Sequence, residues 1–285
     1  MNKKRIKTIA AILIIVAGLI VFLYPTISYI WNGYRDSRLI TEYNHSVAEV
    51  DEGIQTEMLE KARQFNEKIA SRTTKNIIGP DEDYDDPEYE SLLNFGTGIM
   101  GYIEIPAISA KIPVYHYSNA DVLEKGVGHI YGSSLPIGGK STHSVLTGHR
   151  GLSSAALFSE LNRLEEGDMF YLYVCGETLA YKVGKIQTVL PDETGILKIE
   201  DGKDLVTLVT CTPYAINSHR LLVTGERVEY VKEDVEEVTQ TGMIMHAFNP
   251  VTMTVFIGAV LIVSICVFRT VIKKRKGADE YAKDK

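Results

Sequence analysis

Residues 204–224 read DLVTLVTCTPYAINSHRLLVT, two apolar runs separated by a short polar loop. The apolar run from Asp204 to Cys211 is typical of a buried strand, and it ends before Thr212-Pro213 because proline cannot continue a strand ladder. A second strand-like run, NSHRLLVT, follows after the short loop TPYAIN. We therefore expect a hairpin that brings Arg220 close to Cys211, with the cysteine at a strand end where a loop opens.

Similar short runs surround this hairpin over residues 98–231. They are apolar or alternating and are separated by Gly, Pro, Asn and Asp; examples are GYIEIPAI, KIPVYHY, HSVLTGH, MFYLYVC and TLAYKVGKIQTVL. Seven or eight short strands at this spacing predict a mostly β fold, a closed or nearly closed barrel. Residues 153–164 are expected to form one helix within it, because Leu157, Leu161 and Leu164 share a helical face.

Two different segments precede the predicted barrel. Residues 31–78 are rich in Glu, Ala, Gln, Lys and Leu between Arg35 and Arg72, which predicts a helical region in more than one piece. Residues 79–97 follow as a loop, and its first part, GPDEDYDDPEYE, has too many acids and prolines to bury itself. After the barrel, residues 232–249 form an acidic and polar spacer.

Both ends of the chain carry apolar segments with basic flanks. Residues 250–268 precede a basic tail, 269–285, and are long enough to cross the ~30 Å core of a bilayer as a helix. The N-terminal segment, residues 1–30, is either a membrane anchor or a signal peptide that is removed. Because Lys and Arg mark cytoplasmic ends, we expect a two-pass protein of the cell membrane with both termini inside and residues 31–249 outside.

The charge of the chain argues against polyanionic partners. Residues 1–24 and 269–285 hold 11 of the 30 basic side chains, which leaves the middle of the chain with 19 basic and 34 acidic groups, a net charge of −15. Such a domain repels nucleic acid and anionic lipid. An acidic, solvated surface is a simpler interpretation than a site for a cationic partner.

Among the three cysteines, only one stands in a context that indicates chemistry. Cys266 lies inside the C-terminal apolar segment, and Cys175 lies within an apolar strand, FYLYVCGE, where a buried structural role is expected. Cys211 instead ends a strand beside a loop. His149 has a similar position, since it follows the strand HSVLTG and precedes Arg150-Gly151.

Cys211, His149 and Arg220 together supply the parts of a cysteine acyl transferase. A thiol becomes a good nucleophile only when it is deprotonated, and an imidazole can take that proton and return it to a leaving amine. Arginine does no acid–base chemistry at neutral pH, so its expected role is to stabilise an oxyanion. His143 and His219 lie close to these residues in the sequence, and we expect both to be structural.

These motifs resemble those of the sortase family. The sequence Thr207-Leu-Val-Thr-Cys211 is similar to the signature that ends a sortase barrel strand, and His149 within TGHRG and Arg220 match the other two catalytic positions. The two membrane segments and the acidic segment before the barrel resemble the pilus-assembling class C. In that class a lid covers the active-site groove with an Asp-Pro pair and an aromatic residue; here Asp86, Pro87 and Tyr89 are similar, with the aromatic one place late.

The resemblance implies a cysteine transpeptidase that needs no cofactor or metal. Its substrate would be a pilin or surface protein with a sorting signal like Leu-Pro-x-Thr-Gly, cleaved through a thioacyl intermediate at Cys211 and joined to an amine, for class C a pilin lysine. Two alternatives stay open. One is a housekeeping sortase that attaches proteins to cell-wall peptide, and the other is a membrane scaffold without catalytic activity.

Overall fold

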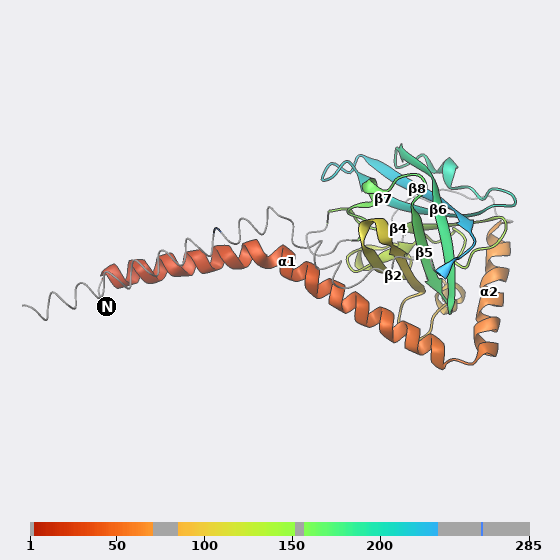
Figure 1. Ribbon diagram of the computed structural model, residues 1–285, viewed down its shortest axis with the longest axis horizontal. Helices are drawn as coiled ribbons and strands as arrows, with labels where there is room; N and C mark the ends of the chain where they lie inside the picture. Colours follow the sequence, from red (N-terminus) through yellow and green to blue (C-terminus); the bar gives the residue numbers. More distant parts are fainter. Residues whose placement is uncertain (1–2, 71–84, 152–156, 233–257, 259–285) are drawn as a thin grey trace, which may run out of the picture. The chain divides into compact units, whose positions relative to one another are not determined.

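The computed structural model describes residues 3–70, 85–151, 157–232 and 258 of the chain (Figure 1). The chain divides into two compact units. One contains residues 28–243 and holds the barrel, and the other contains residues 1–27 and 244–285. Of the second unit, only the N-terminal helical part and Gly258, which is also helical, lie among the described residues.

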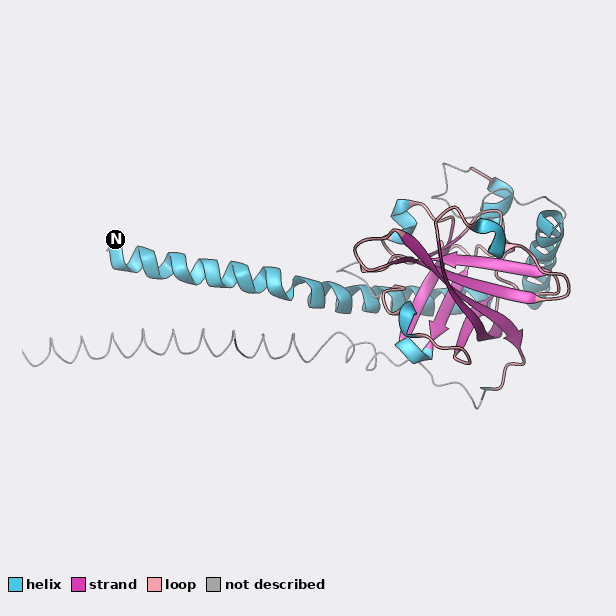
Figure 2. Ribbon diagram, turned by 90° about the horizontal axis from the view of Figure 1, so that it is seen from above, coloured by secondary structure: helices cyan, strands magenta, loops and turns pink. Residues whose placement is uncertain are grey.

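Eight strands form a closed barrel, as the sequence predicts (Figure 2). Around the barrel they follow the order β1-β2-β3-β4-β7-β8-β6-β5. The pairs are antiparallel except for β2 with β3 and β4 with β7, which are parallel. The strands are β1 (Gly101–Ile105), β2 (Ala110–His116), β3 (Val127–His129), β4 (Thr142–Thr147), β5 (Met169–Val174), β6 (Glu177–Val189), β7 (Asp204–Thr212) and β8 (His219–Val228).

Strand β7 is buried on both faces along most of its length. Val206 and Leu208 belong to the main core of the barrel, whereas Val209 packs in a second apolar cluster with Val145 and Leu222. This double burial explains why the strand reads as a continuous apolar run rather than as an alternating one. Burial decreases at its end, where Cys211 and Thr212 are partly exposed.

Two long helices precede the barrel and confirm the helical prediction for residues 35–70. They are α1 (Lys3–Glu49) and α2 (Glu52–Ala70). Helix α2 lies beside the barrel (Figure 1). Its apolar face packs on the main core with Leu59, Ala62, Phe65 and Ile69. The last part of α1 is fixed by Tyr43, whose hydroxyl donates to the carbonyl of Met100 at 3.0 Å and accepts the backbone N–H of Cys175 at 2.9 Å.

One helix among the described residues is long and apolar enough to cross a membrane. It is Leu13–Glu49, with a mean hydropathy of 2.3 in its most apolar part, and it continues through Pro25. The length and composition of a helix alone are weak support for a membrane span, because signal sequences share them. The second predicted span, residues 250–268, lies outside the described residues apart from Gly258.

Two segments differ from the sequence prediction. The end of the acidic stretch is not an exposed loop, because Pro87–Ser91 form the short helix α3 and Tyr89 is fully buried in it. Asp86 caps this helix by accepting the N–H groups of Glu88 and Tyr89. In the segment predicted as a helix over 153–164, the described part consists of turns and one short 3₁₀ helix, Leu161–Arg163, although its three leucines are buried as expected.

Buried Tyr89 of α3 packs in the main core and forms a polar pair with His129 of β3. Its hydroxyl lies 2.7 Å from Nδ1 of His129. Nε2 of His129 lies 2.8 Å from the carbonyl of Ser134 and must therefore donate, which leaves Nδ1 to accept from Tyr89. Complete burial lowers the pKa of His129 to about 4, so the imidazole stays neutral at neutral pH.

We expect Tyr89→Phe to destabilise the fold by about 1–3 kcal/mol, because the change leaves a buried imidazole nitrogen without its donor. The free energy of unfolding, obtained from urea titrations followed by circular dichroism, measures the loss. Tyr214→Phe is the matched control, since Tyr214 is 61% exposed. Equal stability of Tyr89→Phe and wild type would contradict the pairing.

Candidate active site

The ends of β4, β7 and β8 bring the three predicted catalytic residues to one edge of the barrel. Cys211 and Arg220 are direct partners in the antiparallel register of β7 and β8, so their side chains lie on the same face. In the parallel pair, Thr147 is opposite Val209, and His149 follows two residues later, as Cys211 does on β7. The register therefore leads His149 and Cys211 to the same edge of the barrel, two residues beyond its last pair.

The backbone keeps this alignment just beyond the end of β4. The N–H of Gly148 donates to the carbonyl of Val209 at 3.1 Å, and the hydroxyl of Thr210 donates to the carbonyl of Gly148 at 2.8 Å. The carbonyl of His149 accepts the N–H of the fully buried Phe158 at 3.2 Å. The strand leading to the histidine is thus joined to the strand that carries the thiol.

The hairpin turn after Cys211 holds Arg220. The carbonyl of Pro213 accepts the N–H groups of Ile216 and Asn217 and closes the turn. Nη1 of Arg220 donates to the carbonyls of Asn217 and His219, each at 3.2 Å. These two bonds use one nitrogen of the guanidinium, whose other N–H groups can serve an acceptor at the strand end.

The environment of His149 favours a neutral imidazole. Partial burial lowers the pKa of His149 below its ordinary value, and the carboxylate of Glu124 offsets part of this effect. A neutral imidazole can take the proton of a neighbouring thiol, and the resulting cation then stabilises the thiolate. The site therefore has the parts of an acid–base pair.

Among the described residues, Cys175 and His143 have buried surroundings, whereas His219 is partly exposed. Cys175 is buried, and burial raises the pKa of its thiol to about 11, so it is not a thiolate at neutral pH. His143 is held on both sides of its ring, by the carbonyl of Lys198 at 2.9 Å and the hydroxyl of Thr207 at 2.7 Å. His219 lies at the hairpin turn, where Nδ1 is 2.8 Å from the hydroxyl of Ser218.

The predicted lid residues lie in a different environment from the three strand ends. Asp86 accepts a hydrogen bond from the hydroxyl of Tyr131 at 2.6 Å, and its own N–H donates to the hydroxyl of Tyr117 at 3.0 Å. Pro87 opens α3, and the ring of Tyr89 packs against Phe65, His116, Tyr117, His129 and Tyr131. The gating role of Asp86, Pro87 and Tyr89 stays a prediction, and residues 79–84 of that segment lie outside the described part.

One connection near the site was missed by sequence reasoning. Arg150, which follows His149 in the motif TGHRG, donates to the hydroxyl of Thr212 at 2.9 Å and to the side-chain oxygen of Asn162 at 2.8 Å. Thr212 directly follows Cys211. The motif itself contained Arg150, but its partners are 62 and 12 residues away, so spacing alone gave no role for it.

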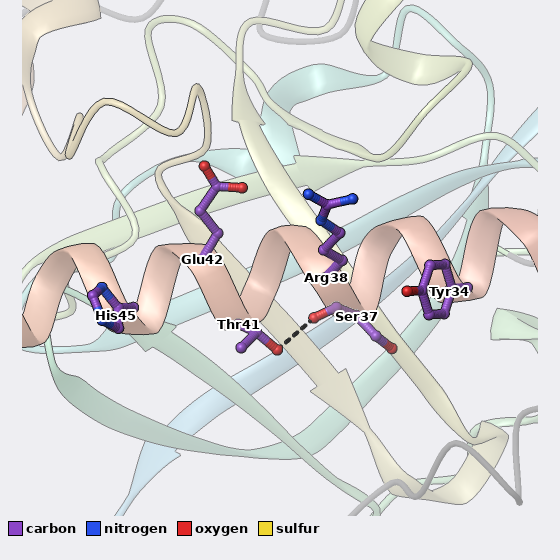
Figure 3. A pocket seen from close by; sticks show the side chains of 6 residues that line it. All are labelled: Tyr34, Ser37, Arg38, Thr41, Glu42 and His45. Atoms are coloured by element: carbon purple, nitrogen blue, oxygen red, sulfur yellow. Dashed lines mark hydrogen bonds between the residues drawn. The ribbon is translucent and has the colours of Figure 1, made fainter.

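A separate shallow pocket of about 450 Å³ lies on α1 (Figure 3). Its described lining is Tyr34, Ser37, Arg38, Thr41, Glu42 and His45. These residues do not belong to β4, β7 or β8, so the pocket is distinct from the strand-end site. Among the described residues, no cluster of three His, Cys, Asp or Glu side chains is arranged to hold a metal ion.

Comparison with protein families gives a match to the sortase domain over residues 103–228. Sortase D of Bacillus subtilis (strain 168) is 30% identical over 165 residues, which cover 56% of this chain and 80% of that protein. Sortase A of Bacillus anthracis is 28% identical over 232 residues, which cover 80% of this chain and 97% of that protein. The match to the sortase domain, over residues 103–228, includes His149, Cys211 and Arg220.

Solved structures give the same result. Sortase C of Streptococcus pneumoniae matches with a TM-score of 0.64 and 42% identity, over 68% of this chain and 97% of that one. Sortase C-1 of Actinomyces oris matches with a TM-score of 0.58 and 45% identity, over 62% of this chain and 99% of that one. The chain belongs to the sortase family, and it is a cysteine transpeptidase.

Proposed function

We propose that this chain is a class C sortase that polymerises pilins on the cell surface. The observation that supports the proposal is the register of β4, β7 and β8, which brings the strand ends that carry His149, Cys211 and Arg220 to one edge of the barrel. Two relatives support the class assignment. The Streptococcus pneumoniae sortase C is described with pilin substrate specificity. The sortase C1 of GBS belongs to a pilus island, and it is 40% identical over 69% of this chain and 100% of that one, with a TM-score of 0.65.

The first half of the proposed reaction forms a thioester. His149 takes the proton of Cys211, and the sulfur attacks the Thr carbonyl carbon of a Leu-Pro-x-Thr-Gly-like signal. The carbonyl electrons move to oxygen, where the guanidinium of Arg220 stabilises the negative charge. The C–N bond to glycine then breaks, and His149 returns the proton to the leaving amine.

The second half transfers the acyl group. The amine of a pilin lysine, in its neutral form, attacks the thioester carbonyl and gives its proton to His149. The C–S bond breaks, the thiol of Cys211 regains that proton, and an isopeptide bond joins the two proteins. The thioester retains the energy of the cleaved peptide bond, so the scheme needs no cofactor.

The proposed location follows from the ends of the chain. A membrane helix at residues 1–30 and another at 250–268, both with basic cytoplasmic flanks, would hold the barrel outside the cell membrane. This position fits the substrates, which are surface proteins or pilins. It also keeps the catalytic domain close to newly exported chains.

The test is a reaction of the full chain in detergent micelles with a purified pilin that carries the sorting signal. We expect a ladder of covalent polymers on denaturing gels. A housekeeping sortase would instead give single adducts when cell-wall peptide amines are supplied, and a scaffold would give no product. Single adducts without a ladder would overturn the class assignment, and the absence of any thioacyl adduct would overturn the transpeptidase mechanism.

A further inference from the structure

We infer that Arg150 is a positioning residue that holds the strand end of His149 against the strand end of Cys211. The inference rests on the proposed function, because it assigns Arg150 to the geometry of that reaction. Arg150 directly follows His149, and its partner Thr212 directly follows Cys211. A single side chain thus connects the residues next to the base and the nucleophile.

The two arms of the guanidinium reach two different elements. Nη1 donates to the hydroxyl of Thr212 at 2.9 Å, and Nη2 donates to Oδ1 of Asn162 at 2.8 Å. Asn162 lies in the 3₁₀ helix Leu161–Arg163, and its neighbour Leu161 is fully buried in the core. The core therefore provides a fixed point, through which Arg150 sets the position of Thr212.

A second contact joins the same two strand ends. Gly151 has φ +84°, and a Cβ atom at this position would overlap the ring of Tyr214, which lies in the turn between β7 and β8. The N–H of Gly151 also donates to the hydroxyl of Ser159 at 3.1 Å. The segment after His149 thus packs closely on the turn that follows Cys211.

The contacts of Arg150 and Gly151 matter because the hydrogen-bonded pairing of β4 and β7 ends before it reaches His149 and Cys211. The regular register of β4 and β7 ends at Thr147 and Val209, and the bonds of Gly148 extend it by only one residue. His149 and Cys211 both lie beyond this point. Catalysis depends steeply on such distances, since a misplacement of about 1 Å can cost about 10²-fold in rate.

The geometry requires the fork of an arginine and not only its charge. Arginine presents several donors in a rigid plane, whereas lysine presents one flexible ammonium group. Lysine at position 150 keeps the positive charge but cannot bond Thr212 and Asn162 in the same directions. Comparison of Arg150→Lys with Arg150→Gln therefore separates positioning from electrostatic stabilisation.

The experiment measures acylation of the full chain in detergent micelles with a Leu-Pro-x-Thr-Gly peptide under single-turnover conditions. We expect Arg150→Lys and Arg150→Gln to slow acylation alike, by about 10–100-fold, with little change in melting temperature. Thr212→Val, which removes only the acceptor of the Arg150 hydrogen bond, should also slow acylation. The double variant Arg150→Gln/Thr212→Val should be no slower than Arg150→Gln alone, because both changes break the same bond.

The pH dependence of Cys211 alkylation by iodoacetamide gives a readout that needs no substrate. A displaced His149 should shift this profile in the Arg150 variants. The matched control is Arg163→Gln, because Arg163 is exposed on the same segment as Asn162 and pairs with Glu160 at 2.9 Å. Its acylation rate and alkylation profile should equal those of wild type.

Three results would overturn the inference: wild-type acylation in Arg150→Gln, recovery of the wild-type rate in Arg150→Lys, or an unchanged alkylation profile in both. If the Arg150 variants fail to fold, wild-type acylation in Thr212→Val overturns it instead. Failure of the proposed function looks different, since the wild-type chain itself would then form no thioacyl adduct. The alkylation profiles would still report whether Arg150 positions His149.

Discussion

Replacement of Cys211 with alanine is expected to abolish the thioacyl adduct and all polymer formation. The sulfur of this side chain is the only atom of the enzyme that bonds to the substrate carbonyl carbon in the proposed mechanism, and alanine at this position has no nucleophile. Mass spectrometry of the full chain after exposure to a Leu-Pro-x-Thr-Gly peptide measures the adduct. The expected loss is complete, because no neighbouring group can replace the sulfur in a covalent step.

The matched control for this experiment is Cys175→Ala. Cys175 is a buried thiol of the same domain, with a pKa raised to about 11 by its burial, and its Sγ lies 3.6 Å from the carbonyl of Gln55. This variant should still form the adduct on Cys211. Adduct formation by Cys211→Ala would contradict the assignment of Cys211 as the nucleophile. Loss of the adduct only in Cys175→Ala would contradict it as well.

The second large effect is expected for Arg220. Removal of one donor to an oxyanion typically costs about 10²–10³ in rate, so Arg220→Gln should slow acylation by about that factor. Arg220→Lys should recover little of the loss, because a single ammonium group cannot reproduce the guanidinium held at the hairpin turn. Single-turnover acylation separates this effect from a change in later transfer to the amine.

Arg227→Gln is the control on the same strand. Arg227 lies at the other end of β8, where it is 3.9 Å from Asp204 and stacks over the ring of Tyr181. Its replacement removes an arginine of the same strand without changing the site, so acylation should stay at the wild-type rate. A loss equal to that of Arg220→Gln would indicate that the two changes act through the stability of β8.

The sequence predicted the parts of the fold that depend on local patterns. The hairpin that pairs Cys211 with Arg220 was predictable because two β runs flank a short loop with a proline at its start. The closed barrel followed from the number and spacing of such runs, and the helices before it followed from composition. In each case the signal is a local pattern of neighbouring residues, which for the barrel repeats along the chain.

The missed features depend on contacts between distant parts of the chain. Tyr89 lies in a stretch dense with acids, and only the fold reveals that its hydroxyl completes the hydrogen bonds of the buried His129. Arg150 is similar, because its role depends on Thr212, which is far away in the sequence. Residues 157–164 bury their leucines without forming an α-helix, since packing on the core outweighs helical periodicity there.

The parallel pairing of β4 with β7 has a consequence for the order of folding. The two strands join residues about 62 positions apart, and contacts of such long range form late because a large loop must first close. Under the proposed mechanism, a newly synthesised polypeptide therefore carries an unactivated sulfur until β4 and β7 have paired. The thiol then becomes reactive only when the barrel has folded, so an incompletely folded chain forms few thioesters with the peptides it meets.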